Sequence, residues 1–319
     1  MGPSRRGLLA LLAALPFARS ARAATPRQVL AFYYGWYGLN PPRHWPEAGE
    51  AVTNRPAGGP YDSGDPAVAA RHVQQAKAAG ITGLVASWWG EGDATDQNLA
   101  PLLEAAVAAG LTVCAYVEQA ADAAGLEAQL AVLERRAAHR AWLRAEGRPV
   151  VFLFDRVMQT LGEAVVAEVA ARWRGRLFLV GPANDAGEIA SRSAAFDALH
   201  IYSLTFVTDG WPRPFFTRLA RRWMQRWTAA QPGRVRTATV LPGFDDRPLR
   251  REGQRPTTPR RGGATYRALW EAAIAARPDW VLIVSFNEWH EGSEIEPSAE
   301  HGERELAATR EMAARFLAG

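Results

Sequence analysis

Val150-Val151-Phe152-Leu153-Phe154 is an uninterrupted apolar run of strand-forming residues. A run without polar alternation is typical of a strand that is covered on both faces, as in a parallel sheet. A longer stretch with helical periodicity, residues 160–173, follows it. Parallel strands need such a crossover between them. This segment therefore predicts one unit of an α/β fold.

The same alternation of strand and helix extends along the chain. Eight apolar runs predict strands at residues 29–34, 82–88, 112–117, 149–154, 176–181, 196–202, 234–241 and 280–286. The predicted helices are residues 67–79, 97–109, 126–146, 160–173, 186–194, 214–230, 264–276 and 302–317. Eight such units predict an α/β fold, a single-domain (β/α)8 TIM barrel. A doubly wound open sheet is the competing topology, but no glycine-rich phosphate loop opens the first helix.

The first 23 residues have the pattern of an export signal. Arg5-Arg6 precede the apolar run 7–17, and Ala21-Arg22-Ala23 has the small-x-small form of a cleavage site. The arginine pair resembles a twin-arginine signal, and a general secretory signal is the alternative. The run is too short to span a bilayer. We therefore expect residues 24–319 to form a periplasmic or secreted domain without stable membrane insertion.

The charge and cysteine content exclude two other classes. Lys and Arg total 37 against 33 Asp and Glu, which gives a net charge of +4. Nearly all the cations are arginines, and they are spread among acidic residues along the predicted helices, which argues against nucleic-acid binding. Cys114 is the single cysteine, so the chain is no disulfide scaffold.

Aromatic and acidic residues gather where the predicted strands end. The first strand leads into Tyr33-Tyr34-Gly35-Trp36-Tyr37, the second into Ser87-Trp88-Trp89 and the third into Glu118. The sixth ends at Tyr202, and the eighth leads into Asn287-Glu288-Trp289-His290-Glu291. These carboxyl ends surround the active site of a (β/α)8 barrel. Aromatic faces beside carboxylates indicate a carbohydrate cleft.

Glu288 and Glu291 are the candidate catalytic pair. Glycoside hydrolysis needs an acid for the leaving oxygen and a second group at the anomeric carbon. In a helix-like turn, residues three apart have Cβ atoms about 5–6 Å apart. Retaining enzymes hold their carboxyl groups about 5–5.5 Å apart, so the spacing is compatible with retention. A loop salt bridge is the structural alternative for either glutamate.

Four motifs stand out: FYYGWYG at residues 32–38, His44-Trp45, PYDSGDP at residues 60–66 and SFNEWHEGSEIEP at residues 285–297. Together they resemble glycoside hydrolase family 99, and the last motif is the most specific. That family comprises endo-acting α-mannosidases and α-mannanases and a wider family 99-like group attached to polysaccharide loci. Several βα loops of this chain are short, which favours the family 99-like group.

The resemblance implies a retaining mechanism without a metal or other cofactor. Glu288 would act as a base on the sugar's own 2-hydroxyl, which attacks the anomeric carbon and gives a 1,2-anhydro intermediate. Glu291 would be the acid for the leaving group and then the base for water. With Asn287 and His290 of the same motif included, the expected substrate-binding residues are Tyr34, Trp88, Glu118, Tyr202, Asn287 and His290.

Alternatives stay open at two places in the predicted site. His290 could ligate a metal if His200, Asp155 and Glu288 supplied further ligands. We favour a role for His290 in binding a sugar hydroxyl or orienting a carboxylate. Asp245-Asp246 could serve the site, but a capped turn is the simpler interpretation.

The function class has an alternative as well. The same barrel could be a non-hydrolytic glycan-binding protein for polysaccharide export or assembly, because fold alone does not define function. A pure binder has no need of two neighbouring carboxylates. The sequence therefore favours a monomeric hydrolase of α-mannoside-like oligosaccharides or polysaccharides.

Overall fold

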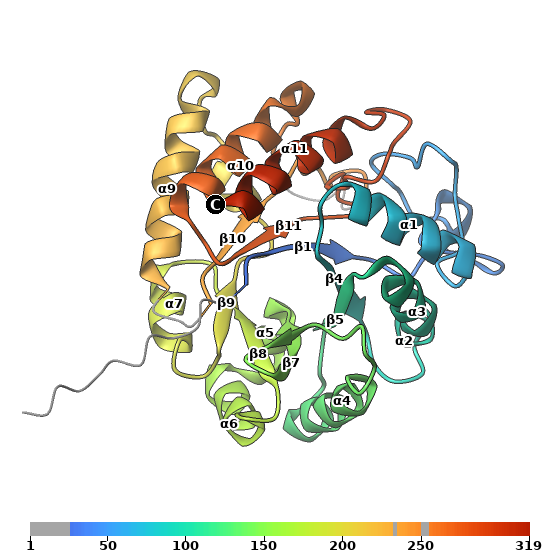
Figure 1. Ribbon diagram of the computed structural model, residues 1–319, viewed down its shortest axis with the longest axis vertical. Coiled ribbons are helices and arrows are strands. Elements are labelled where there is room, and N and C mark those ends of the chain that lie inside the picture. Colours follow the sequence, from blue (N-terminus) through green and yellow to red (C-terminus); the bar gives the residue numbers. More distant parts are fainter. Residues whose placement is uncertain (1–25, 232–234, 250–254) are drawn as a thin grey trace, which may run out of the picture.

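The computed structural model describes residues 26–231, 235–249 and 255–319, so the predicted export signal, residues 1–23, lies outside the described residues. Within these ranges, eight strands form the ring that Figure 1 shows end-on, in the order β10-β11-β1-β4-β5-β7-β8-β9. Every neighbouring pair along this path is parallel. The strands are β1 (Gln28–Tyr33), β4 (Gly83–Trp88), β5 (Thr112–Val117), β7 (Arg148–Leu153), β8 (Phe178–Pro182), β9 (Ala198–His200), β10 (Thr237–Val240) and β11 (Trp280–Ile283).

Helices cover the outside of this ring (Figure 1). The longer ones are α1 (Pro66–Ala78), α3 (Leu99–Ala109), α4 (Ala123–Arg136), α6 (Glu163–Trp173), α9 (Phe216–Ala230), α10 (Ala264–Ala276) and α11 (Arg304–Ala318). The shorter ones are α2 (Ala94–Gln97), α5 (Asp155–Leu161), α7 (Ala186–Arg192), α8 (Thr205–Thr208), η1 (Pro46–Ala48), η2 (Arg213–Phe215) and η3 (Arg261–Gly263). The predicted (β/α)8 barrel is confirmed. No helix in the described ranges is long and apolar enough to cross a membrane.

Helix α4 ends earlier than the periodicity of its sequence predicts. Residues 126–146 read as one helix, but α4 ends at Arg136. The chain then forms β6 (Arg144–Ala145), which pairs antiparallel with β7. Glu146 and Gly147 connect the two strands with positive φ angles of 51° and 77°. A two-residue hairpin of this kind needs positive φ at both positions. The Ala- and Arg-rich sequence before it has a helical pattern that continues to the turn, so the pattern does not predict where the helix ends.

The seam between β9 and β10 is closed partly by side chains. One isolated backbone bridge joins Ala198 to Val235. The buried hydroxyls of Thr237 and Thr239 donate hydrogen bonds across the seam to the carbonyl oxygens of Leu199 and Ile201. These hydroxyls satisfy carbonyl groups that would otherwise be buried without a donor.

We expect Thr239→Val to lower the free energy of unfolding by about 1–3 kcal/mol. Valine has nearly the same shape, but it leaves the Ile201 carbonyl buried without its donor. Urea unfolding measures the change, with Thr160→Val on the exposed surface of α5 as the matched control. Equal stability of the two variants would show that the hydroxyl does not hold the seam.

A long segment after β1 lies against the loop that follows β11. It contains β2 (Gly38–Leu39), β3 (Pro42–Arg43) and η1. The Thr53 amide donates to the Trp289 carbonyl over 2.8 Å, and the Ala57 amide donates to the Pro297 carbonyl over 2.8 Å. This packing brings residues 44–61 beside the motif at 285–297, although about 230 residues separate them in sequence.

Candidate active site

The loop after β11 is held in one shape by its own serines. The Glu288 amide donates to Ser285 Oγ over 2.8 Å, and the hydroxyls of Ser285 and Ser293 lie 3.0 Å apart. The Ser285 amide donates to the Ser293 carbonyl over 2.7 Å. Because these groups are buried and paired, the loop presents its glutamates from a fixed backbone.

Glu288 is buried, with 3% of its surface exposed. Its Oε1 lies 2.7 Å from Nδ1 of His290 and also accepts from the His290 amide over 3.1 Å. Its Oε2 is buried and has no hydrogen-bond partner among the described residues. A buried carboxylate oxygen without a donor is costly, so this oxygen is available for a hydroxyl group of a bound molecule.

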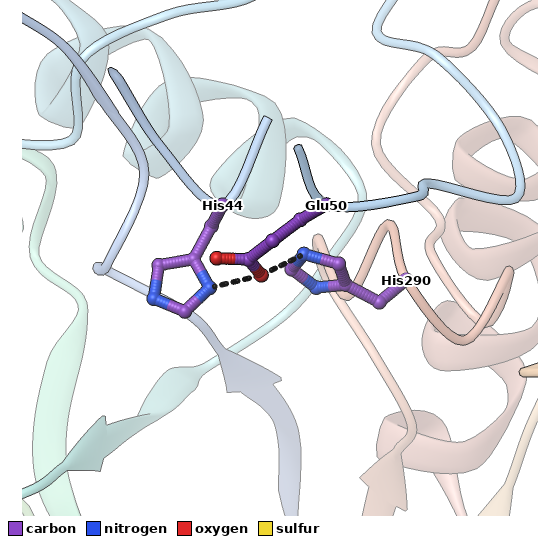
Figure 2. Close-up of side chains that lie close together, drawn as sticks. All are labelled: His44, Glu50 and His290. Atoms are coloured by element: carbon purple, nitrogen blue, oxygen red, sulfur yellow. Dashed lines mark hydrogen bonds and ion pairs between the residues drawn. The ribbon is translucent and has the colours of Figure 1, made fainter. Parts of the chain in front are cut away.

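His290 links Glu288 to a second carboxylate. Its Nε2 lies 3.3 Å from Oε2 of Glu50 (Figure 2). Its ring is stacked on that of Tyr37, with 5.8 Å between the ring centres. Burial by itself lowers the pKa of His290, but the hydrogen bond to Glu288 and the charges of Glu288 and Glu50 raise it above its usual value. His290 therefore orients Glu288, which is the second of the two roles expected for it.

Glu291 lies on the same loop after β11, and its side chain faces a cavity. It lines a cavity of about 330 Å³ at the carboxyl ends of the strands. The Tyr202 hydroxyl donates to Oε2 of Glu291 over 2.9 Å, and the Tyr34 hydroxyl donates to that of Tyr202 over 2.6 Å. A partly exposed carboxyl group beside a cavity can exchange protons with a ligand and with water.

The charges of three glutamates act on the hydroxyl of Tyr34. Burial raises the pKa of Tyr34 well above its usual value, and the charges of Glu118, Glu291 and Glu288 raise it further. Charges perturb a pKa in this way at short range. The structure therefore brings together the predicted Tyr34, Glu118, Tyr202, Glu288 and Glu291.

Glu118 follows β5 and differs from the other two glutamates. The Ser87 hydroxyl donates to its Oε1 over 2.7 Å. Burial raises the pKa of Glu118 to about 7, although Ser87 and Arg156 act in the opposite direction. Near neutral pH this carboxyl group is therefore partly protonated and can donate a hydrogen bond as well as accept one.

Stability should fall as the pH rises through the pKa of Glu118. A raised folded-state pKa contributes stability that is present below the ordinary value of 4.5 and is lost toward about 7. We expect Glu118→Gln to remove up to about 3 kcal/mol of this pH dependence. Urea unfolding of both proteins at about pH 4.5 and about pH 7.5 measures it. Glu294, which has a similarly raised pKa, is common to both proteins. An unchanged slope would show that Glu118 ionises normally.

The site has the depth and lining of a small-ligand pocket. Residues on several strand ends surround the cavity: Tyr116, Phe154, Asp155, Arg156, His200, Tyr202, Phe206, Phe244, Asp246 and Glu291. Both aromatic rings and acidic groups line it, as expected for a carbohydrate cleft. Residues 42–310 match the family model described as glycosyl hydrolase family 99. The chain belongs to glycoside hydrolase family 99.

Relatives of this family 99 protein are found among animal and bacterial enzymes. It is 25% identical to the rat glycoprotein endo-alpha-1,2-mannosidase, in a match that covers 84% of this chain and 67% of the relative. It is 27% identical to the human glycoprotein endo-alpha-1,2-mannosidase-like protein, in a match that covers 83% of this chain and 67% of the relative.

The fold is also found in solved structures. The family 99 endo-alpha-mannosidase from Bacteroides thetaiotaomicron, in complex with Bis-Tris propane, superimposes with a TM-score of 0.79 and 25% identity. The match covers 91% of this chain and 97% of that one. Family membership shows that the chain is a glycoside hydrolase.

Trp88 was predicted to bind substrate in the cleft of this family 99 protein, but the structure buries it. It is 1% exposed, and its indole N–H donates to Asp96 over 3.0 Å. Trp89 takes the open side instead, with the guanidinium of Arg156 5.1 Å from its ring centre. Strand alternation allows only one of two adjacent residues to face the cleft, and the sequence alone gave no way to choose between them.

Asn287 was also expected to bind substrate, and its geometry opposes this. It is fully buried, and its Oδ1 accepts from the Tyr34 amide over 2.8 Å. Its Nδ2 donates to the Tyr34 carbonyl and the Tyr61 hydroxyl over 2.9 and 3.1 Å. Both amide protons are therefore used inside the protein. Asn287 fixes the β11 loop to β1 and positions its neighbour Glu288.

The metal set considered from sequence is not assembled. Nε2 of His200 bonds to the Leu153 carbonyl over 3.1 Å, and burial lowers the pKa of His200 to about 4. Among the described residues, His290 instead meets His44 and Glu50. Asp245 forms the expected turn with Arg247, whereas Asp246 lines the cavity.

Sequence reasoning missed Glu50 and assigned no role to Arg156. Glu50 follows a glycine in a loop, and no predicted barrel strand ends near it. Its place near the site is therefore seen only in the structure, through its contact with His290. Arg156 lies directly after the fourth strand, where a functional residue is expected, and this position was the available signal.

Proposed function

We propose that this hydrolase acts on α-mannoside-like glycans with retention of anomeric configuration, using Glu288 and Glu291 in different roles. The single observation that carries the proposal is the different setting of the two groups. Glu288 is buried with one free oxygen beside His290, and Glu291 lines the cavity beside Tyr202. The relatives named endo-alpha-1,2-mannosidases support the class of substrate.

In the first step, Glu288 takes the proton of the substrate 2-hydroxyl through its free oxygen. The 2-oxygen forms a bond to the anomeric carbon while the bond from that carbon to the leaving oxygen breaks. Glu291 gives its proton to the leaving oxygen. The products are a free alcohol and a 1,2-anhydro sugar, with Glu288 protonated and Glu291 ionised.

In the second step, water attacks the anomeric carbon and gives its proton to Glu291. The bond from the 2-oxygen to the anomeric carbon breaks, and Glu288 returns the proton to that oxygen. Both glutamates regain their starting states. Two successive inversions at the same carbon leave the anomeric configuration retained.

The rest of the site supports this division of roles. His290 holds Oε1 of Glu288, so Oε2 faces away from that bond. Tyr202 donates to Glu291, and Tyr34 donates to Tyr202, which fixes the direction of the Glu291 carboxyl group. Glu118, with its pKa raised to about 7 by burial, supplies a group that can donate to a sugar hydroxyl.

The test compares matched α-mannoside oligosaccharides with and without a free 2-hydroxyl on the reacting sugar. We expect cleavage of the first and no cleavage of its 2-O-methyl counterpart, with the α-anomer as the first product seen by NMR. Equal cleavage of both substrates would contradict the role of Glu288. Binding of both without cleavage of either would favour the glycan-binding alternative.

We also propose that the mature domain is exported to the periplasm or beyond. The support is the sequence of residues 1–23, with Arg5-Arg6 before an apolar run. Cell fractionation of the wild type and of a variant with both arginines replaced by lysine tests the route. Loss of export in the variant indicates the twin-arginine pathway, and unchanged export indicates general secretion.

A further inference from the structure

A compact cluster of nitrogen and oxygen ligands lies next to Glu288, and the proposed chemistry uses only one of its members, His290, to orient Glu288. Figure 2 shows the side chains of His44, Glu50 and His290 pointing toward one another from separate segments. Oε2 of Glu50 lies 3.1 Å from Nδ1 of His44 and 3.3 Å from Nε2 of His290. One ligand atom from each residue falls within 4.8 Å of the others.

These distances fit a tetrahedral metal site. Zinc binds imidazole nitrogens and carboxylate oxygens at about 2.0–2.2 Å, so neighbouring ligand atoms lie about 3.3 Å apart. Two of the three separations here have that length without any movement of the chain. Two histidines and one glutamate also match the ligand set of zinc sites that keep a fourth position for water.

A second observation points to a ligand at this place. Nε2 of His290 is buried and makes no hydrogen bond of normal geometry among the described residues, although Oε2 of Glu50 lies 3.3 Å from it. Nδ1 of the same ring bonds to Glu288 over 2.7 Å. When Nδ1 carries the proton and donates it to the carboxylate, the lone pair of Nε2 faces Glu50 and His44. A carboxylate that holds the far side of a metal-binding imidazole is a common feature of zinc sites.

His44 is held for this position at a conformational cost. Its φ angle is 58°, in the left-handed region that costs most residues energy. Its ring is stacked on Trp36 with a centroid distance of 4.7 Å and an interplanar angle of 18°. Strained residues fixed by packing gather at ligand-binding sites.

We propose that His44, Glu50 and His290 form a binding site for one divalent transition metal ion with the ligand preferences of zinc. The site is separate from the cavity lined by Glu291, because none of its three residues lines that cavity. Its existence does not depend on the proposed hydrolase mechanism. The alternative is that a proton takes the place of the metal on Nε2 of His290. The ring would then bridge the carboxylates of Glu50 and Glu288 through its two N–H groups.

The test is metal binding to the purified chain without an affinity tag, after removal of metals with a chelator. We expect calorimetry with Zn²⁺ to show a single ion bound per chain, and Co²⁺ to give the intense visible absorption of a four-coordinate ion. His44→Ala should weaken Zn²⁺ binding about a hundredfold or more, and Glu50→Gln should also weaken it.

The matched control is His139→Ala, since His139 forms an exposed pair with Glu104 at 3.2 Å. This control should bind Zn²⁺ as the wild type does. The melting temperature of each variant without metal shows that it is folded. No saturable binding up to about 100 μM Zn²⁺, or equal affinity of the wild type and His44→Ala, would overturn the proposal and leave the bridging proton.

Discussion

Glu291→Gln is expected to lower kcat on natural glycans by about 10²–10⁴-fold, because the amide cannot protonate the leaving oxygen. The Glu291 carboxyl group lines the cavity, and Tyr202 holds its direction. Glutamine keeps the shape and the hydrogen bond from Tyr202. Oligosaccharide binding should therefore stay close to that of the wild type. Steady-state kinetics and calorimetry with the same oligosaccharide separate the two effects.

The control for Glu291→Gln is Glu300→Gln on the same loop. Glu300 is exposed and accepts from the Arg55 amide over 3.0 Å. Its substitution removes one negative charge without touching the cavity, so turnover should be unchanged. Equal kcat in Glu291→Gln and the wild type would remove Glu291 from the mechanism.

Glu288→Gln is expected to reduce kcat by at least about a thousandfold. Glutamine cannot accept the proton of the substrate 2-hydroxyl, and the hydrogen bond of His290 loses its charged acceptor. The loss should persist at every substrate concentration, since it concerns the chemical step rather than binding. Progress curves at high enzyme concentration would measure the residual rate.

Glu296→Gln is the matched control for Glu288→Gln. Glu296 is also a buried glutamate of this loop, paired with His72 at 3.0 Å and with the Tyr61 hydroxyl at 2.9 Å. Its carboxyl group contacts α1 and the long segment after β1, whereas that of Glu288 contacts His290. Glu296→Gln should lower the melting temperature. At temperatures where the variant is still folded, its kcat should equal that of the wild type. A fall in kcat of equal size in both variants would mean that loop integrity, and not Glu288, limits turnover.

The periodic parts of the fold could be predicted from the sequence. Apolar runs such as Val150–Phe154 predict the strands. Asp65 before Pro66 predicts the start of α1. In the structure, Asp65 caps this helix by accepting from the Ala67 amide over 2.8 Å. The end of α4 could not be predicted, because a hairpin with two positive φ angles leaves no trace in helical periodicity.

The site was predictable where it depends on strand ends and not where it depends on distant partners. Glu288 and Glu291 follow directly from the last strand. The role of Asn287 depends on Tyr34 and Tyr61, which lie 253 and 226 residues away. Glu50 meets His290 across a similar separation. Such contacts arise only when the long segment after β1 folds against the last loop.

A series of aryl α-mannosides with leaving groups of falling pKa tests the division of roles between the two glutamates most directly. A good leaving group needs no proton, so the first step of Glu291→Gln, measured as the dinitrophenol released in the first turnover, should recover most of its rate. Glu288→Gln should stay inactive across the series, because attack by the 2-hydroxyl still needs a base. Recovery of Glu288→Gln, or failure of Glu291→Gln to recover, would contradict the assignment of acid and base.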